Sequence, residues 1–357
     1  MNLVLYMSMV VSGYLGALYE QMFSRSNRWF LAATALLFVL TTSSRLGNSF
    51  DYSDLTIYIQ YFIDNNEAYF EPGYVFLTDS IRFVFGDNPL ALMVFVALWV
   101  VAAVLLSDVI CTKCQKGGQD EVSFFPSTLL LAVILYWGCI FACEGLRNGL
   151  AISIMLCASA LAINERTGYA ALLSVLAILF HYSAILFLPG ILVLRVVKQI
   201  NRDIYLYWFV LLFVLDIILT AVYTFQIPYI SDFFELMGEW EMLSRYDAYN
   251  EEEAGSYFST QYVTYHLFAL LMLFGNLNDK RYNRAVMIYF IGLSFGTLFS
   301  SLIIVMRIQW LYLSMVVFSL YYFLRDKDMD ILKKQTVLCG YTLIEAVMIL
   351  RYLGWHV

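Results

Sequence analysis

Long apolar runs with few charged residues recur along most of the chain. They cover residues 3–19, 29–44, 89–110, 124–141, 146–163, 204–224, 260–277, 285–304, 308–324 and 335–350. A helix that crosses the hydrocarbon core of a bilayer needs about 20 predominantly apolar residues, so each run is close to the length of one span. The pattern predicts an all-α, polytopic membrane protein of about 11 transmembrane helices. We expect them to form a single membrane domain over residues 1–357.

A further apolar stretch, residues 169–194, fits neither one span nor two. Its 26 residues exceed one untilted crossing and fall short of the roughly 40 that two crossings require. We expect a broken or re-entrant pair of short helices that meet around His181 and Tyr182. Non-helical backbone at membrane depth is tolerated only where protein buries it or where it lines a wet cavity. The break is therefore a candidate site.

Lysines and arginines divide unequally between alternate loops, which predicts the orientation in the membrane. Of the 21 basic residues, 15 fall on the side that we assign to the cytoplasm: Arg25, Arg28, Lys113, Lys116, Arg166, Arg195, Lys198, Arg202, Lys280, Arg281, Arg284, Arg325, Lys327, Lys333 and Lys334. The other side holds Arg45, Arg82, Arg147, Arg245, Arg307 and Arg351. Both termini and two long loops, residues 45–88 and 225–259, are then extracytoplasmic. On this map the 169–194 segment enters the membrane and returns to the same side.

Composition narrows the classes of function. Hydrophobic residues make up 61% of the chain and charged residues 14%, whereas soluble domains carry about 25% charged residues. A net charge of -7 argues against a nucleic-acid partner, which would need a clustered basic face. Cys111 and Cys114 form a C-x-x-C without a second pair or a nearby histidine, so we expect no metal site and no cofactor. The opening MNLVLYMSMVV lacks a basic leader and a cleavage site, which favours a retained first helix.

Three arginines on the extracytoplasmic side are candidates for binding an anion. Arg307 has no acidic residue within eight positions on either side, and an unpaired arginine at a membrane span is unfavourable unless it meets an anionic group. Arg45 precedes Asp51 and Asp54, and a local ion pair that orders the loop is the alternative for it. Arg147 lies three residues after Glu144, so an intrahelical pair would also explain it.

Other polar residues in or near the spans have competing explanations. His181 is a substrate-binding or catalytic candidate, although a lone histidine among apolar residues is commonly a hydrogen-bonded structural one. Asp216 and Glu345 lie inside predicted spans without a partner of obvious spacing, and we expect structural roles for both. Tyrosines near the outer loops, such as Tyr52, Tyr58 and Tyr74, could stack on sugar rings.

Arginines, carboxylates and a histidine on one membrane face suit a particular chemistry. Guanidinium groups bind phosphate oxygens bidentately and stay charged at any working pH, so three of them suit a diphosphate leaving group. A carboxylate or histidine beside them can serve a nucleophile that needs a base. The chain has no nucleotide-binding glycine motif, which indicates that the donor is carried by the membrane.

Several segments, in order, resemble the EpsG family of Wzy-like bacterial polysaccharide polymerases. They are DYSDLTIYIQYF, EPGYVFLTDSIRFVFG, EGLRNGLAISIM, LAILFHYSAILFLPG and MRIQWLY. The resemblance implies a GT-C-like membrane glycosyltransferase that uses glycans on undecaprenyl diphosphate at the extracytoplasmic face. It also marks residues of the matching motifs: Asp51, Tyr52, Glu71, Pro72, Gly73, Arg147, Asn148, His181 and Arg307.

These observations together predict a metal-independent, inverting polymerase in the bacterial cytoplasmic (inner) membrane. It would move a growing glycan from undecaprenyl diphosphate onto a lipid-linked repeat unit, with a chain-length regulator of the Wzz type as a further candidate partner. The predicted roles are a catalytic group of His181, Glu144 and Asp51, a diphosphate-binding group of Arg147, Arg307 and Arg45, and a glycan-contacting group of Tyr52, Glu71, Asn148 and Tyr182. An O-antigen-type ligase and a flippase or transporter of lipid-linked oligosaccharide are the alternatives.

The charge map makes a topological prediction. Reporter fusions at Lys116, Asp279 and Asp328 should report the cytoplasm, because each position lies in a loop on the lysine- and arginine-rich side. A fusion in the 225–259 loop, which should report the outside, is the control. An outside signal from two of the first three fusions would contradict the map.

Overall fold

The computed structural model describes residues 1–47, 54–64, 70–113, 125–224, 260–298 and 310–352. These described residues are 86% helical and contain no strand, which confirms the predicted all-α class. They form two compact units: unit 1 comprises residues 1–196 and 317–357, and unit 2 comprises residues 197–316.

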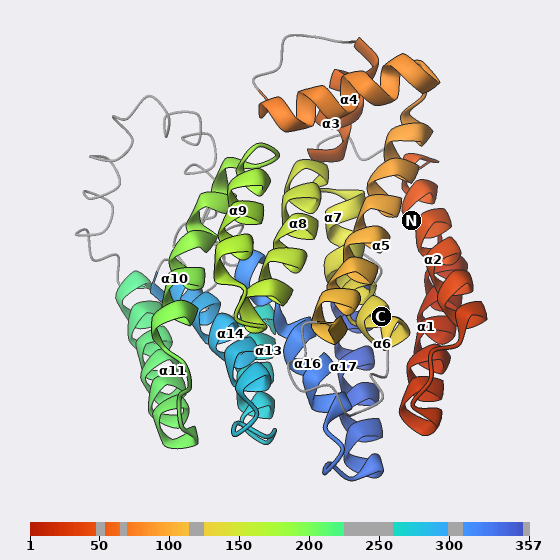
Figure 1. The fold of residues 1–357 in the computed structure, drawn as a ribbon. Helices are drawn as coiled ribbons and strands as arrows, with labels where there is room; N and C mark the ends of the chain where they lie inside the picture. Colours follow the sequence, from red (N-terminus) through yellow and green to blue (C-terminus); the bar gives the residue numbers. More distant parts are fainter. Residues whose placement is uncertain (48–53, 65–69, 114–124, 225–259, 299–309, 353–357) are drawn as a thin grey trace. The chain divides into compact units, whose positions relative to one another are not determined.

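Unit 1 contains most of the helices, and Figure 1 labels them. They are α1 (Leu3–Phe23), α2 (Arg28–Ser43), α3 (Asp54–Asp64), α4 (Pro72–Phe85), α5 (Pro89–Lys113), α6 (Pro126–Val133), α7 (Cys139–Cys143), α8 (Leu146–Ile163), α9 (Thr167–Ile178), α10 (Leu188–Val196), α16 (Val316–Arg325, which begins at the boundary) and α17 (Ile331–Tyr352). Short irregular turns link some of them: η1 (Ser44–Gly47), the π-helical η2 (Ile134–Gly138) and η3 (Tyr182–Phe187). Unit 2 contains α11 (Arg202–Thr224), α13 (Thr260–Met272) and α14 (Lys280–Leu298).

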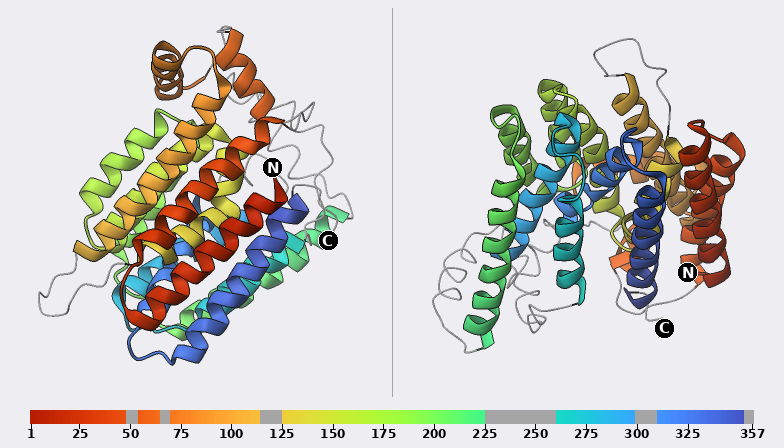
Figure 2. Two further views of the ribbon diagram at one scale, coloured as in Figure 1. Left: turned by 90° about the vertical axis from the view of Figure 1, so that its right-hand side faces the viewer. Right: turned by 90° about the horizontal axis from the view of Figure 1, so that it is seen from below.

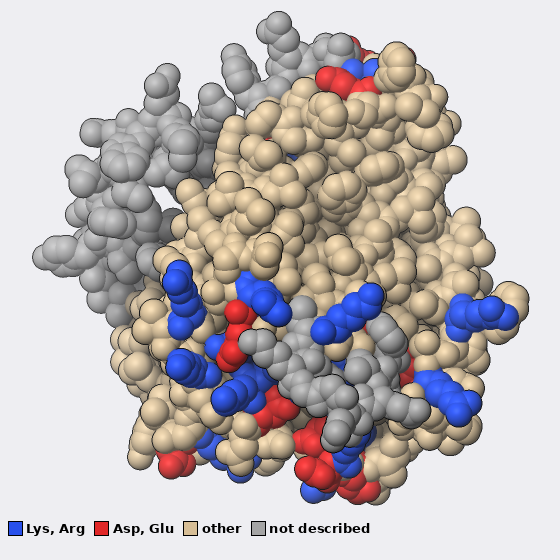
Figure 3. Space-filling view, in the orientation of Figure 1, with Lys and Arg blue, Asp and Glu red and all other residues tan. Residues whose placement is uncertain are grey.

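Five helices of the described residues are long and apolar enough to cross a membrane: Leu3–Phe23, Arg28–Leu46, Pro89–Lys113, Pro126–Cys143 and Leu146–Ile163. Shorter apolar helices occupy Thr167–Ile178, Tyr182–Val196, Val263–Met272 and Trp310–Arg325. The predicted runs therefore coincide with helices, although fewer of these reach full spanning length than the predicted count. Figure 3 shows wide areas of one face that carry neither basic nor acidic side chains, as contact with lipid requires.

The first span packs against the second and against α6. α1 and α2 run side by side (Figure 2). α6 has Pro126 in its first turn, and its N-cap residue Phe125 supplies no side-chain cap. The fully buried Glu20 of α1 supplies one instead: its carboxylate accepts hydrogen bonds from the backbone N–H groups of Ser127 and Thr128, both at 2.8 Å. The start of α6 is thereby fixed to α1, because the free N–H groups of a helix start favour a negative partner.

The 169–194 segment is broken where the sequence predicted it. α9 ends at Ile178, and His181 has extended backbone angles (φ -159°, ψ 119°) before the turn η3 begins. α10 then packs back against α9, so the two form a helical hairpin with His181 near its tip.

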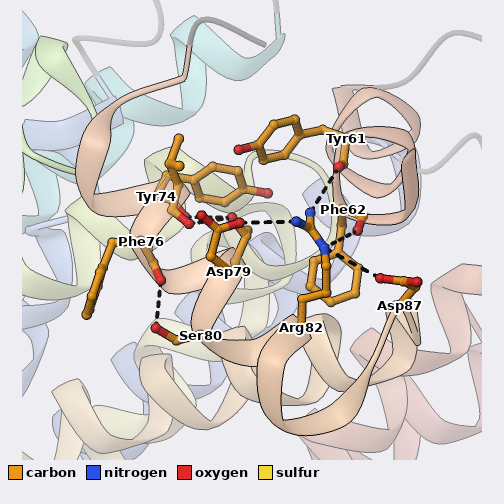
Figure 4. A network of polar contacts seen from close by, with 10 residues as sticks. Tyr61, Phe62, Tyr74, Phe76, Asp79, Ser80, Arg82 and Asp87 are labelled. Carbon is orange, nitrogen blue, oxygen red and sulfur yellow. Dashed lines mark hydrogen bonds and ion pairs between the residues drawn. The ribbon is translucent and has the colours of Figure 1, made fainter. Parts of the chain in front are cut away.

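The predicted 45–88 loop contains two short helices, α3 and α4, and hydrogen bonds from Arg82 link them. Arg82 of α4 donates from Nε to the carbonyl of Phe62 at 3.0 Å and from Nη2 to the carbonyl of Tyr61 at 3.3 Å, and it pairs with Asp79 and Asp87. Figure 4 shows this guanidinium between the two helices. Arg82 thus satisfies carbonyl groups at the end of α3, which have no partner inside that helix.

Unit 2 buries an acid and a base that lie 50 residues apart in sequence. His266 Nε2 of α13 lies 2.9 Å from Asp216 Oδ2 of α11, and Thr297 Oγ1 of α14 lies 3.3 Å from the same oxygen. Spacing along one span could not reveal this partner of Asp216, because α13 brings the histidine from a distant part of the chain. Glu345, in α17 of unit 1, is also buried.

The cap on α6 makes a stability prediction. Replacing Glu20→Gln should destabilise the chain by about 1 to 3 kcal/mol, because an amide offers one acceptor oxygen where the carboxylate offers two and leaves a buried donor unsatisfied. Thermal unfolding of detergent-extracted protein measures the loss. Glu165→Gln, at an exposed position of the same unit, is the matched control and should unfold at the temperature of the unchanged protein.

Candidate active site

The structure describes seven of the ten residues predicted for the site, all in unit 1. These are Arg45, Glu71, Glu144, Arg147, Asn148, His181 and Tyr182. Asp51, Tyr52 and Arg307 lie outside the described residues. The roles assigned to those three stay predictions.

Glu71 is the centre of the candidate site. Arg147 Nη1 lies 2.6 Å from Glu71 Oε2, and His181 Nδ1 lies 3.0 Å from Glu71 Oε1. The backbone N–H of Tyr182 points to Glu71 Oε1 at 3.4 Å. One buried carboxylate, whose side chain is 3% exposed, therefore joins a guanidinium to an imidazole.

Backbone geometry explains why the EPG sequence lies at this point. Glu71 is the N-cap of α4, and Pro72 occupies the first turn. Backbone N–H groups there have no acceptor inside the helix, so the missing N–H of proline is tolerated. The N–H of Gly73 donates to the carbonyl of Leu179 at 2.8 Å, just before His181. A Cβ on residue 73 would lie 2.7 Å from that carbonyl oxygen, so this close approach requires glycine. The start of α4 and the tip of the broken hairpin thus dock through their backbones.

Arg147 is held on three sides in the first turn of α8. Its guanidinium lies over the rings of Phe70 and Tyr58, with 4.6 Å and 5.3 Å to the centroids, and its Nε donates to the Tyr58 hydroxyl at 3.3 Å. A cation at a helix start opposes the helix dipole, and Glu71 offsets this effect. Nη2 of Arg147 has no hydrogen-bond partner among the described residues, so one edge of the guanidinium is available to an anion.

The ionised state of Glu71 determines which ring nitrogen of His181 donates a hydrogen bond to it. Burial raises the pKa of Glu71, but the hydrogen bond with His181 and the charge of Arg147 outweigh burial and lower that pKa to about 2. An ionised carboxylate can only accept hydrogen bonds, so His181 Nδ1 must be the donor. Nε2 of His181 meets no partner within the described parts of the chain, and an imidazole nitrogen that carries no proton can accept one.

A second ion pair includes Glu144, which precedes Arg147 by three residues. Arg45 Nη2, in the turn after α2, is paired with Glu144 Oε1, in the junction between α7 and α8. Burial raises the pKa of Glu144, and the positive charge of Arg45 opposes that rise. The intrahelical Glu144–Arg147 pair is therefore wrong: each residue pairs with a partner from another segment.

Several buried polar atoms of the described residues have no hydrogen-bond partner, and two of them belong to residues of the candidate site or its surroundings. These two are the hydroxyl of Tyr74, in α4, and Oδ1 of Asn148, next to Arg147. Buried polar atoms are nearly always paired, so these two keep unused hydrogen-bonding capacity beside Arg147 and Glu71.

The rings of Tyr58 and Tyr74 do not have the role that the sequence suggested for them, which was to stack on sugar rings. Tyr58 and Tyr74 are 4% and 0% exposed, and they pack with Tyr61 and Phe70 in one aromatic cluster. Their faces are therefore unavailable for stacking on a sugar. Phe70, which supports Arg147, was missed by sequence reasoning. Its position directly before the EPG sequence was the only signal.

The described residues include no group of three or more His, Cys, Asp or Glu side chains placed to hold a metal ion. What they do contain is an ionised carboxylate that fixes a histidine tautomer beside an arginine with a free edge. This arrangement can remove a proton from a hydroxyl and bind an anionic leaving group.

The lowered pKa of Glu71 predicts a specific pH dependence of stability. The folded-state pKa, about 2, is below the ordinary value of 4.5, so the unfolded chain binds the proton more readily. The stabilisation is complete above pH 4.5 and is lost as the pH falls towards 2. The unfolding temperature of the unchanged protein should drop more between pH 5 and pH 3 than that of Glu71→Gln. Parallel pH curves for the two proteins would contradict the assignment.

Comparison with known proteins identifies the family. A family model described as the EpsG family matches residues 28–355. Searches of curated proteins and of solved structures find no match. The matched range contains all the site residues above and nearly the whole chain. The chain therefore belongs to the EpsG family of Wzy-like, polysaccharide-polymerase-related membrane proteins, and it is a membrane protein of polysaccharide biosynthesis.

Proposed function

We propose that this protein is a polysaccharide polymerase. It transfers a growing glycan from undecaprenyl diphosphate to a lipid-linked repeat unit at the extracytoplasmic face of the bacterial cytoplasmic membrane. The observation that carries the proposal is the shared carboxylate of Glu71, which holds His181 and Arg147 together. Membership of the EpsG family supports the substrate class.

Arg147 is the primary contact for the donor diphosphate. Its Nη1 and Nε groups are engaged by Glu71 and Tyr58, and Nη2 is the group left for a phosphate oxygen. A second cation is required because a diphosphate leaving group carries more charge than one guanidinium offsets. Arg45 is the described candidate, and Arg307 is the candidate from the sequence.

His181 is the general base. The hydroxyl oxygen of the acceptor sugar attacks the anomeric carbon of the donor sugar, and the hydroxyl proton passes to His181 Nε2. The bond between the anomeric carbon and the diphosphate oxygen breaks, and undecaprenyl diphosphate leaves with the electron pair. Glu71 stabilises the imidazolium that forms, in the manner of a carboxylate behind a catalytic histidine. Attack opposite the leaving group inverts the anomeric centre.

The remaining site residues contact the glycan or the base. Asn148, next to Arg147, is a candidate contact for the glycan, and Tyr182 is 53% exposed beside His181. Tyr52 and Asp51 are further candidates from the sequence. Glu144 is the weaker base candidate of the original group, because Arg45 occupies one of its oxygens. A Wzz-type regulator remains a candidate partner.

The glycan ladder of a strain that lacks this protein tests the proposal. We expect a single repeat unit on the final acceptor, because the transfer that lengthens the glycan is missing. Long glycan stranded on undecaprenyl diphosphate would identify a ligase instead. Intermediates held on the cytoplasmic face would identify a flippase.

Complementing that strain with site variants tests the residues. Arg147→Lys should lose most of the long glycan although the positive charge is kept, because an ammonium cannot reproduce the planar set of donors that contacts Glu71, Tyr58 and phosphate together. Arg166→Lys, at an exposed position, is the matched control and should restore a full ladder. Near-normal glycan length with Arg147→Lys would remove this arginine from the site.

His181→Gln separates binding from proton transfer. The amide can donate the hydrogen bond to Glu71 but cannot take a proton at neutral pH. We therefore expect normal protein levels with almost no long glycan. Substantial polymerisation by this variant would move the role of base to another residue.

A further inference from the structure

One turn of π-helix interrupts the most deeply buried span. The span Pro126–Cys143 consists of α6, the π-helical turn Ile134–Gly138 and α7. π-turns are rare, occur mostly as single bulges inside α-helices and are frequent at functional sites. This span ends at Cys143, directly before Glu144 of the second ion pair.

Two tyrosines from other helices hold this turn. The Tyr6 hydroxyl of α1 donates to the carbonyl of Leu135 at 2.9 Å, and the Tyr341 hydroxyl of α17 donates to the carbonyl of Ala132 at 2.9 Å. Tyr6 is 0% exposed and Tyr341 is 4% exposed. A π-turn disturbs the regular pairing of helix carbonyls, and a buried carbonyl needs a donor. The Tyr6 hydroxyl supplies a donor inside the turn, and the Tyr341 hydroxyl supplies one two residues before it, in the last turn of α6.

The extra residue of the π-turn changes the direction in which Glu144 points. Each residue of an α-helix rotates the chain by about 100°, so one inserted residue turns everything after it by that angle. The span cannot absorb the change by rotating as a whole, because Glu20 fixes its first turn through Ser127 and Thr128. The π-turn therefore decides whether Glu144 faces Arg45.

We infer that Tyr6 and Tyr341 are positioning residues for the Arg45–Glu144 pair. Their hydroxyl groups stabilise the π-turn, and the π-turn directs Glu144 towards Arg45 at the edge of the candidate site. The inference rests on the proposed function in one respect only. If Arg45 binds the donor diphosphate, the two tyrosines help to fix the position of a donor-binding residue.

A mutant cycle tests this inference without measuring any reaction. Arg45→Gln, Glu144→Gln and the double variant are compared by their thermal unfolding midpoints in detergent, using the full chain. In the otherwise unchanged protein the two effects should be non-additive, because contacting residues are energetically coupled. The same cycle in a Tyr6→Phe, Tyr341→Phe background should show additive effects, since Glu144 no longer faces Arg45.

Tyr289→Phe is the matched control background. Tyr289 is also a buried tyrosine whose hydroxyl donates to a carbonyl of another helix, that of Tyr265 at 2.8 Å, but it belongs to unit 2. Its loss should leave the coupling at full size. If the double phenylalanine background does not survive extraction, each single background is put through the same cycle and should show reduced coupling.

Two results would overturn the inference: full coupling in the phenylalanine backgrounds, or no coupling in the unchanged protein. Neither result tests the proposed glycan donor, because the unfolding experiments contain no substrate. Conversely, a ladder that identifies a ligase or a flippase would change the proposed function and leave the coupling result intact.

Discussion

The need to pair a buried charge organises the candidate site. An ionised carboxylate is unstable in apolar surroundings unless several donors reach it. Glu71 meets this need with Arg147, His181 and the backbone of Tyr182. The start of α4, the first turn of α8 and the tip of the broken hairpin are consequently held at one point. Removing this carboxylate would leave a buried guanidinium without its counter-charge and a histidine without a fixed tautomer.

Two other buried acids, Glu20 and Asp108, also have several hydrogen-bond donors around them, but their role is structural. Glu20 has both oxygens engaged by the start of α6. Asp108 accepts hydrogen bonds from the hydroxyl of Tyr321 at 2.6 Å and from the backbone of Phe125 at 3.3 Å. These contacts link helices and give each acid a structural role. The Glu71 group differs because its partners keep hydrogen-bonding capacity: Nη2 of Arg147 and Nε2 of His181 have no partner among the described residues. That unused capacity distinguishes a site from a structural pair.

The irregular backbone of unit 1 lies next to these charges. The 169–194 helix breaks at His181, where Gly73 docks against Leu179. The Pro126–Cys143 span contains a π-turn, and tyrosine hydroxyl groups donate to one carbonyl inside that turn and to one just before it. In a membrane each freed backbone group requires a partner from the protein. Both irregularities are stable because neighbouring helices provide such partners, and each one directs a charged or titratable side chain towards the candidate site.

The sequence by itself determined the helical class, the positions of the apolar segments and the break around His181, because hydropathy and segment length are local properties of the chain. Its motifs also indicated Glu71, Arg147 and His181 as members of one site. Only the tertiary structure decided the partners. Spacing allowed Glu144 to pair with Arg147 three residues away, yet Glu144 pairs with Arg45, and Arg147 pairs with Glu71. Partner choice depends on which helices pack together and on the rotation that a π-turn imposes, and neither can be determined from spacing along a single segment.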